Sequence, residues 1–325
     1  MGQSRKALII GIDDYPDIPL KCCCNDADAI KQLLSFHEDG SPNFSVKKLK
    51  NVNKKGDLKQ YIYDCFSGDD EIALFYFSGH GYIDSLGGYL VTPDYSDNDY
   101  GVSFQDVINI VNQSNCRNKI IILDCCYSGS MGSINTQGQQ TAIINEGVSI
   151  LTACTSKESA IEYNGHGLFT ELIISALKGG ASDITGHITP GGIYSYIDKT
   201  LGPWDQRPVF KTNVSRFISL RDVKPQVDVS IIRKLKDYFA TETDTMNLDP
   251  SFEPTNTPDD IHRVIFPYAD PTNTKIFDDL QQLEGIGLVV PVGEKHMYYA
   301  AMNSKSCRLT SIGKHYWRLV KEGKI

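Results

Sequence analysis

Residues 72–81 read IALFYFSGHG, an unbroken apolar and aromatic run that ends in a histidine between two glycines. Residues 120–129 read IIILDCCYSG and repeat the arrangement, because an apolar run again ends in reactive side chains. Continuous rather than alternating apolar strands are typical of parallel sheets that are covered on both faces. Since the carboxyl ends of parallel strands meet at one edge of a sheet, we expect His80 and Cys126 to lie close together there.

The rest of the first 220 residues alternates short apolar runs with segments of helical periodicity. This order predicts an α/β fold with a mostly parallel sheet flanked by helices. The stretch 129–147, rich in Gly, Ser, Gln and Asn, is interpreted as a long mobile loop. The predicted strands are 7–12, 44–49, 72–77, 120–123, 148–153 and 214–220, and the predicted helices are 26–36, 57–66, 103–111, 168–177 and 191–201.

A second, smaller domain is expected to follow a polar, proline-containing segment at 222–228. We therefore predict one domain over residues 1–222 and another over 228–325. The second has the order helix, short hairpin, helix, which predicts a small winged-helix-like α+β domain. Its predicted helices are 229–240, 274–284 and 309–321, and its predicted strands are 288–292 and 297–302.

The charge and the cysteine content of the chain restrict the ligands and the cellular compartment that we expect. The 325 residues carry a formal net charge of −8, which disfavours binding to nucleic acid or anionic membrane across the whole surface. Nine cysteines, an odd number with adjacent runs, predict no disulfide framework and favour a reducing compartment. Their spacing suits zinc poorly. No signal peptide and no run of 18 apolar residues is evident, so we expect a cytoplasmic protein without a membrane segment.

A thiol and an imidazole held by rigid strand ends are what nucleophilic catalysis requires. The motifs YFSGHG and DCCYSG resemble those of the caspase-like cysteine peptidase superfamily, in its metacaspase and bacterial caspase-like branch. The resemblance extends to LKCCCNDA at 20–27 and GHGLFT at 165–170, and covers about residues 5–220. It implies a cysteine endopeptidase in which Cys126, not Cys125, is the nucleophile and His80 the base.

The resemblance also implies further site residues. The oxyanion donors would be the backbone N–H groups of Gly81 and Cys126. Asp26, Ser78 and Asp124 would line the pocket for the residue before the cut. Two carboxylates in one pocket favour a cationic side chain, so we predict cleavage after Arg or Lys.

Two departures from the metacaspase pattern matter. The acids Asp94, Asp97, Asp99 and Asp106 are scattered rather than consecutive, so we expect no cofactor, and calcium activation is disfavoured. Residues 129–147 contain no Lys or Arg. An enzyme specific for basic residues would not cut itself there, and Lys157 is the first downstream candidate.

Plainer interpretations stay open for several residues. One alternative is that Asp26 only caps the helix at 26–36, as Asn-Asp before a periodic run does. Another is that Asp124 is an ordinary solvated carboxylate. His166, in a second Gly-His-Gly, is interpreted as part of a helix N-terminal turn rather than as a catalytic residue. For Trp204 the alternatives are a place in the wall of the substrate pocket and a place in the core or at the surface.

The expected function is hydrolysis of a protein target after a basic residue, with a role as an effector in bacterial cell death or antiviral defence implied by the resemblance alone. An activator or partner protein is expected to bind the C-terminal domain. The alternatives are a catalytically silent interaction scaffold and a regulator whose basic winged helix binds nucleic acid, a partner that is otherwise not expected.

Overall fold

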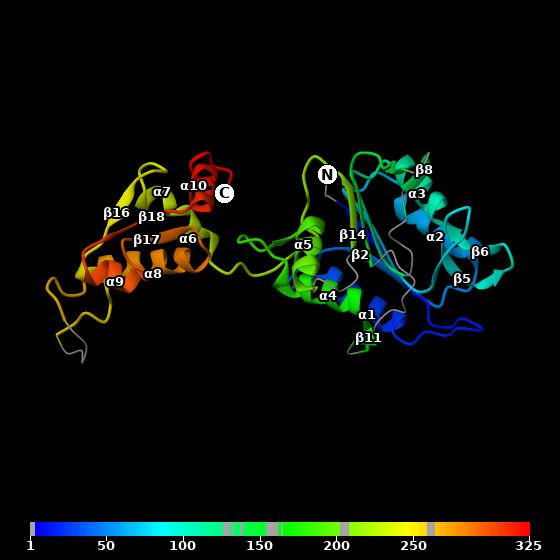
Figure 1. Cartoon of the computed structure of the whole chain (residues 1–325), viewed down its shortest axis with the longest axis horizontal. Coiled ribbons are helices and arrows are strands. Elements are labelled where there is room, and N and C mark those ends of the chain that lie inside the picture. The colour runs from blue at the N-terminus through cyan, green and yellow to red at the C-terminus, as the bar shows by residue number, and fades with distance from the viewer. Residues whose placement is uncertain are drawn as a thin grey trace. The chain divides into compact units, whose positions relative to one another are not determined.

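The structure is a computed structural model that describes residues 4–125, 131, 133–136, 139–153, 162–163, 165–201, 208–258 and 264–325. The chain divides into two compact units, Met1–Lys224 and Pro225–Ile325 (Figure 1). Within the described part of the chain, every helix is too short or too polar to traverse a lipid bilayer.

The first unit is built on a six-stranded sheet in the order β14-β10-β7-β3-β1-β2. All neighbouring strands pair in parallel except β10 with β14. The register places Ser78 of β3 opposite both Gly11 of β1 and Asp124 of β7, so three strands end at the same level. The sheet strands are β1 (Arg5–Gly11), β2 (Ser45–Lys50), β3 (Ile72–Ser78), β7 (Asn118–Asp124), β10 (Val148–Thr152) and β14 (Val209–Asn213).

Helices cover both faces of this sheet (Figure 1). Alternate residues of β1 enter opposite cores: Leu8 and Ile10 pack in the layer under α2 and α3, whereas Ala7 and Ile9 pack under α1, α4 and α5. The helices are α1 (Cys23–Ser35), α2 (Lys55–Phe66), α3 (Phe104–Gln113), α4 (Leu168–Ser175), the π-helical turn η2 (Ala176–Gly180) and α5 (Pro190–Thr200).

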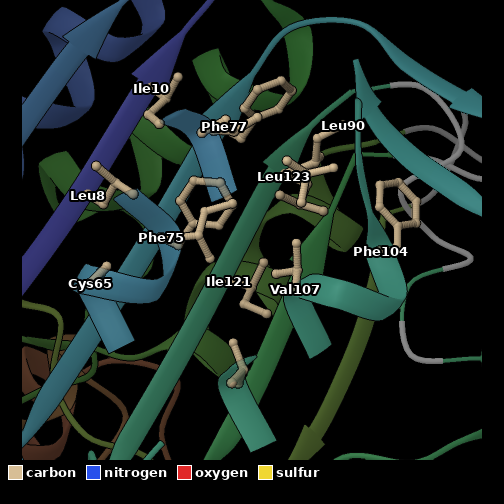
Figure 2. Close-up of a cluster of buried hydrophobic side chains, with 14 of the residues drawn as sticks. Leu8, Ile10, Cys65, Phe75, Phe77, Leu90, Phe104, Val107, Ile121 and Leu123 are labelled. Atoms are coloured by element: carbon tan, nitrogen blue, oxygen red, sulfur yellow. The ribbon is translucent and has the colours of Figure 1, made fainter. Parts of the chain in front are cut away.

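The layer beneath α2 and α3 is aromatic and aliphatic (Figure 2). Phe75 and Phe77 of β3 have no exposed surface, and Figure 2 shows them between Leu8 and Ile10 on one side and Ile121 and Leu123 on the other. Truncation of such a buried Phe to Ala costs about 3–5 kcal/mol. The strand that precedes His80 is therefore a rigid support.

Short strands surround the main sheet. A three-stranded antiparallel sheet of β4, β5 and β6 follows β3 directly. The interpretation of 129–147 as loop throughout is wrong, because β8 and β9 pair there as an antiparallel hairpin. These strands are β4 (Gly81–Ile83), β5 (Gly88–Ser96), β6 (Asp99–Ser103), β8 (Ser133–Thr136), β9 (Gln139–Ala142), β11 (Glu162–Tyr163), β12 (His166–Gly167), β13 (His187–Ile188) and β15 (Arg221–Asp222).

The last sheet strand was expected at 214–220 but is β14, Val209–Asn213. Its Phe210 stacks on Tyr194 of α5, with ring centroids 5.3 Å apart. Aromatic packing and pairing with β10 therefore place the strand earlier than its apolar pattern predicts.

The second unit holds a three-stranded antiparallel sheet in the order β16-β18-β17. Its core includes Phe239, Phe277 and Leu280, all without exposed surface. The elements are α6 (Val229–Arg233), α7 (Leu235–Tyr238), β16 (Thr245–Asn247), the 3₁₀ turn η3 (Pro250–Phe252), α8 (Pro271–Gly285), β17 (Val289–Val292), α9 (Met297–Met302), β18 (Ser306–Leu309) and α10 (Ser311–Lys321).

The strand predicted at 297–302 is wrong, because these residues form helix α9. Met297, Ala300 and Ala301 are buried at helical spacing, i, i+3 and i+4, and Ala and Met are strong helix formers. The partner of β17 is instead β18, after a turn at Ser304 with a φ of 49°. A helix thus separates the two strands of the expected hairpin, and the winged-helix prediction is not confirmed.

Candidate active site

Two neighbouring strands bring the predicted residues to one edge of the sheet. Ser78 ends β3 and Asp124 ends β7, and the two are paired in the register. The pairing extends one step further, because the N–H of Gly79 donates to the carbonyl of Asp124 at 3.3 Å. His80 follows at this edge. Cys126 comes two residues after Asp124 in the sequence and lies outside the described residues.

The loop between β1 and α1 holds His80, which is partly exposed. The backbone N–H of His80 donates to the hydroxyl of Tyr15 at 3.0 Å, and the two rings meet edge to face at 4.5 Å. The imidazole Nε2 lies 2.7 Å from the carbonyl oxygen of Ile18. A carbonyl only accepts, so Nε2 carries the hydrogen and Nδ1 of the neutral ring has a free lone pair.

Tyr15 is itself fixed by the sheet. It is 3% exposed, and its hydroxyl donates to the carbonyl of Val91 at 3.2 Å. Gly79 permits this approach, since a Cβ there would lie 2.6 Å from the Tyr15 oxygen. Burial raises the pKa of Tyr15 well above its usual value, so the hydroxyl stays protonated as a hydrogen-bond donor.

Helix α1 begins earlier than predicted. The carboxylate of Asp13 accepts the N–H groups of Cys23 at 2.9 Å and Cys24 at 3.1 Å, and so satisfies the first turn. Asp26 consequently lies inside the helix, and its own N–H donates to the carbonyl of Cys22. The interpretation of Asp26 as only a helix cap is wrong.

The side chain of Asp26 points into a buried polar cluster. Its Oδ2 accepts the hydroxyl of Ser78 at 2.9 Å, and its Oδ1 lies 2.8 Å from Nδ1 of His166. Burial chiefly, and then the charge of Asp124, raises the pKa of Asp26 to about 7, while the bonds from His166 and Ser78 oppose the rise. The carboxyl therefore titrates near neutral pH.

Asp124 is the deeper of the two acids. Its Oδ2 accepts the hydroxyl of Thr170 at 2.6 Å, and that hydroxyl also lies 2.6 Å from the hydroxyl of Tyr76. Burial raises the pKa of Asp124. A Cβ on Gly167 would lie 2.7 Å from the same Oδ2, so any other residue there would displace this carboxylate. The interpretation of Asp124 as a solvated carboxylate is wrong.

His166 has a larger role in the site than its sequence context indicated. It lies in β12, two residues before α4, as a helix N-terminal turn requires, but its imidazole contacts Asp26 as well. Tyr15 and Thr170 were missed altogether. The motif GHGLFT contains His166, Gly167 and Thr170, which converge on the two acids, so the motif itself was the available signal.

The remaining predicted residues divide into two groups. Gly81 begins β4 and pairs with Leu90 of β5. Lys157 and Trp204, like Cys126, lie outside the described residues. The buried thiol of Cys125, the neighbour of Cys126, belongs to the core under α2 and α3.

Three of the four scattered acids bind lysines or backbone instead of converging. Asp94 accepts the N–H of Lys55, Asp99 pairs with the Lys55 ammonium at 2.5 Å, and Asp106 pairs with Lys59 at 3.0 Å. Over the described ranges, no three His, Cys, Asp or Glu side chains are placed to hold a metal ion.

Comparisons with known proteins bear on this site. The caspase-domain family model matches residues 4–190. No curated protein matches the chain. Among solved structures, caspase-1 from Spodoptera frugiperda is 13% identical with a TM-score of 0.48, over 68% of this chain and 92% of that one. A Geobacter sulfurreducens protein is 14% identical with a TM-score of 0.49, over 68% of this chain and 100% of that one.

The family match extends over more than half of the chain and includes Asp26 on α1 and the strand ends that carry His80 and Asp124. The parallel sheet flanked by helices agrees with that family's fold. The chain belongs to the caspase-domain family of cysteine peptidases, which act on protein substrates.

Proposed function

We propose that this protein is a cysteine endopeptidase that cleaves its protein target after Arg or Lys. The observation that carries the specificity is the buried pair of carboxylates, Asp26 and Asp124, beside the His80 strand end. Buried carboxylates discriminate strongly in favour of cationic groups, because an ammonium or guanidinium supplies the missing counter-charge.

In the proposed reaction, Nδ1 of His80 takes the thiol proton of Cys126. The orientation supports this role, because the Ile18 carbonyl occupies the Nε2 hydrogen and leaves Nδ1 as the acceptor. The thiolate attacks the carbonyl carbon of the peptide bond, and the N–H groups of Gly81 and Cys126 stabilise the oxyanion. His80 then donates its proton to the leaving amine, and a thioester forms.

Water completes the cycle. His80 accepts a proton from a water molecule that attacks the thioester, and the thiolate of Cys126 leaves, which releases the new carboxylate. In this scheme the basic side chain before the cut occupies the site of Ser78, Asp26 and Asp124, and thereby aligns the carbonyl with the nucleophile.

A panel of fluorogenic peptides tests the proposal. The peptides differ only before the bond, with Arg, Lys, Asp, Leu or citrulline, the neutral isostere of Arg. Cleavage of Arg and Lys peptides that Cys126→Ala abolishes is the expected result. Preference for Asp would refute the pocket assignment, and equal activity of Cys126→Ala would refute the mechanism.

The remaining predictions concern the biological setting. The role in bacterial cell death or antiviral defence, and the binding of an activator by the second unit, stay predictions. Of the two alternatives, a silent scaffold predicts no peptide cleavage under any condition. The nucleic-acid regulator predicts salt-dependent retention of the full chain on DNA.

A further inference from the structure

The side chain of Asp26 is shielded from solvent by neighbouring residues of the same chain. The side chain of Asp26 is 1% exposed, whereas that of His166 is 22% exposed. Each oxygen of Asp26 has a partner: Ser78 on the inner side and His166 on the outer side. Since His166 is the more exposed of the two partners, a ligand that reaches Oδ1 takes the position of this imidazole.

His166 also has the chemistry of the expected ligand. A protonated imidazole is a cation with an N–H donor, as are the side chains of Arg and Lys. It comes from β12, a strand of two residues that pairs only with β11 among the described strands. The acids, by contrast, lie on the longer elements α1 and β7.

We propose that His166 is a specificity-determining residue that acts as an internal substitute for the substrate's cation, so that a basic side chain must displace it from Asp26. This inference rests on the proposed specificity for basic residues. This exchange makes the site selective, because only a side chain that binds Asp26 more tightly than the imidazole does can occupy the site. A neutral side chain gains nothing from the exchange.

Binding tests the inference without catalysis. The full chain with Cys126→Ala is titrated by calorimetry with arginine amide and, separately, with citrulline amide. His166→Ala is expected to bind arginine amide at least about 10-fold more tightly, the contribution of one hydrogen bond to a charged group. His166→Lys, which supplies a permanent competitor, is expected to bind it more weakly. Citrulline amide should respond to neither.

A matched control separates this effect from general loosening of the fold. His187 forms the same kind of imidazole–carboxylate pair, with Nδ1 2.7 Å from Asp222, away from the acid pair. His187→Ala should leave the affinity for arginine amide unchanged. His166→Gln, which keeps a neutral donor near Asp26, serves as the conservative variant and should fall between wild type and His166→Ala.

The opposite outcome is informative. If His166 merely positions Asp26, then His166→Ala weakens the binding of arginine amide, and the inference is overturned. Equal affinity in the Cys126→Ala parent and the three His166 variants, or no binding of arginine amide in any of them, also overturns it. Peptide cleavage is scored separately: if wild type cleaves Arg peptides but the ratio of Arg to citrulline cleavage ignores His166, the inference fails and the proposed function stands.

Discussion

The two halves of the candidate site are built in different ways. The His80 half is partly exposed and is held by a loop, through the Tyr15 hydroxyl and the Ile18 carbonyl. The acid half is buried, and Asp26 and Asp124 are bonded by side chains from β3, β12 and α4. A group that transfers protons benefits from access to solvent and substrate, whereas groups that recognise charge gain from burial, where interactions are screened less.

The largest expected loss of activity follows substitution of the nucleophile or of the base. Cys126→Ala and His80→Ala should each lower kcat/KM for Arg peptides at least about a thousandfold, because nucleophile and base act as a unit. The double variant should be no worse than the poorer single one. Steady-state kinetics on Arg peptides, with circular dichroism to verify folding, provides the measurement. Multiplicative losses in the double variant would contradict a shared step.

The next largest loss of activity is expected for a substitution in the acid half of the site. Asp124→Asn should reduce kcat/KM for Arg peptides by about 30-fold or more, because a substrate cation would lose a buried counter-charge. The citrulline peptide should be affected far less. An equal loss on both peptides would mean that Asp124 supports the fold and not the charge recognition. Asp39→Asn, at an exposed acid, is the control.

A smaller effect tests how the loop between β1 and α1 holds His80. Tyr15→Phe removes the hydroxyl that accepts the His80 N–H but keeps the ring. We expect kcat to fall about 5- to 10-fold with KM unchanged, the effect of one hydrogen bond. Tyr238→Phe, which removes a hydroxyl bonded to Asp279 in the second unit, is the matched control. A change in KM alone would assign Tyr15 to substrate binding instead.

The smallest effect concerns pH and the acid half. The pKa of Asp26 is raised to about 7, with Cys23, Asp124 and His166 as its titratable neighbours and Tyr76 beside Asp124. Cys126→Ala protein should therefore bind arginine amide more tightly at pH 8 than at pH 6, and adding Asp26→Asn should flatten this dependence.

The same raised pKa has a consequence for stability. The folded chain holds the Asp26 proton more firmly than the unfolded chain, in which the carboxyl titrates near about 4. This stabilisation is complete below about pH 4 and is lost as the pH rises through about 7. The Tm of wild type should thus fall relative to that of Asp26→Asn between pH 5 and pH 8. A constant difference would contradict the assignment.

Much of the first unit could be predicted because its signals are local. The apolar runs that end in SGHG and DCCYSG are read directly as buried parallel strands, and these motifs also identified the family. Asp124 was predicted from DCCYSG and Asp26 from LKCCCNDA at 20–27, and the structure brings both acids together with Ser78.

The sequence by itself determined the parallel strands, the edge at which they end and the types of reactive side chain placed there, because periodicity and strand length are local properties. Only the tertiary structure decided that Tyr15 holds His80 and that His166 meets Asp26 from 140 residues away. Such contacts depend on how loops and helices pack across the sheet, which no local pattern encodes. The same reason applies to 297–302, where buried packing of Ala300 and Ala301 selected a helix instead of the expected strand.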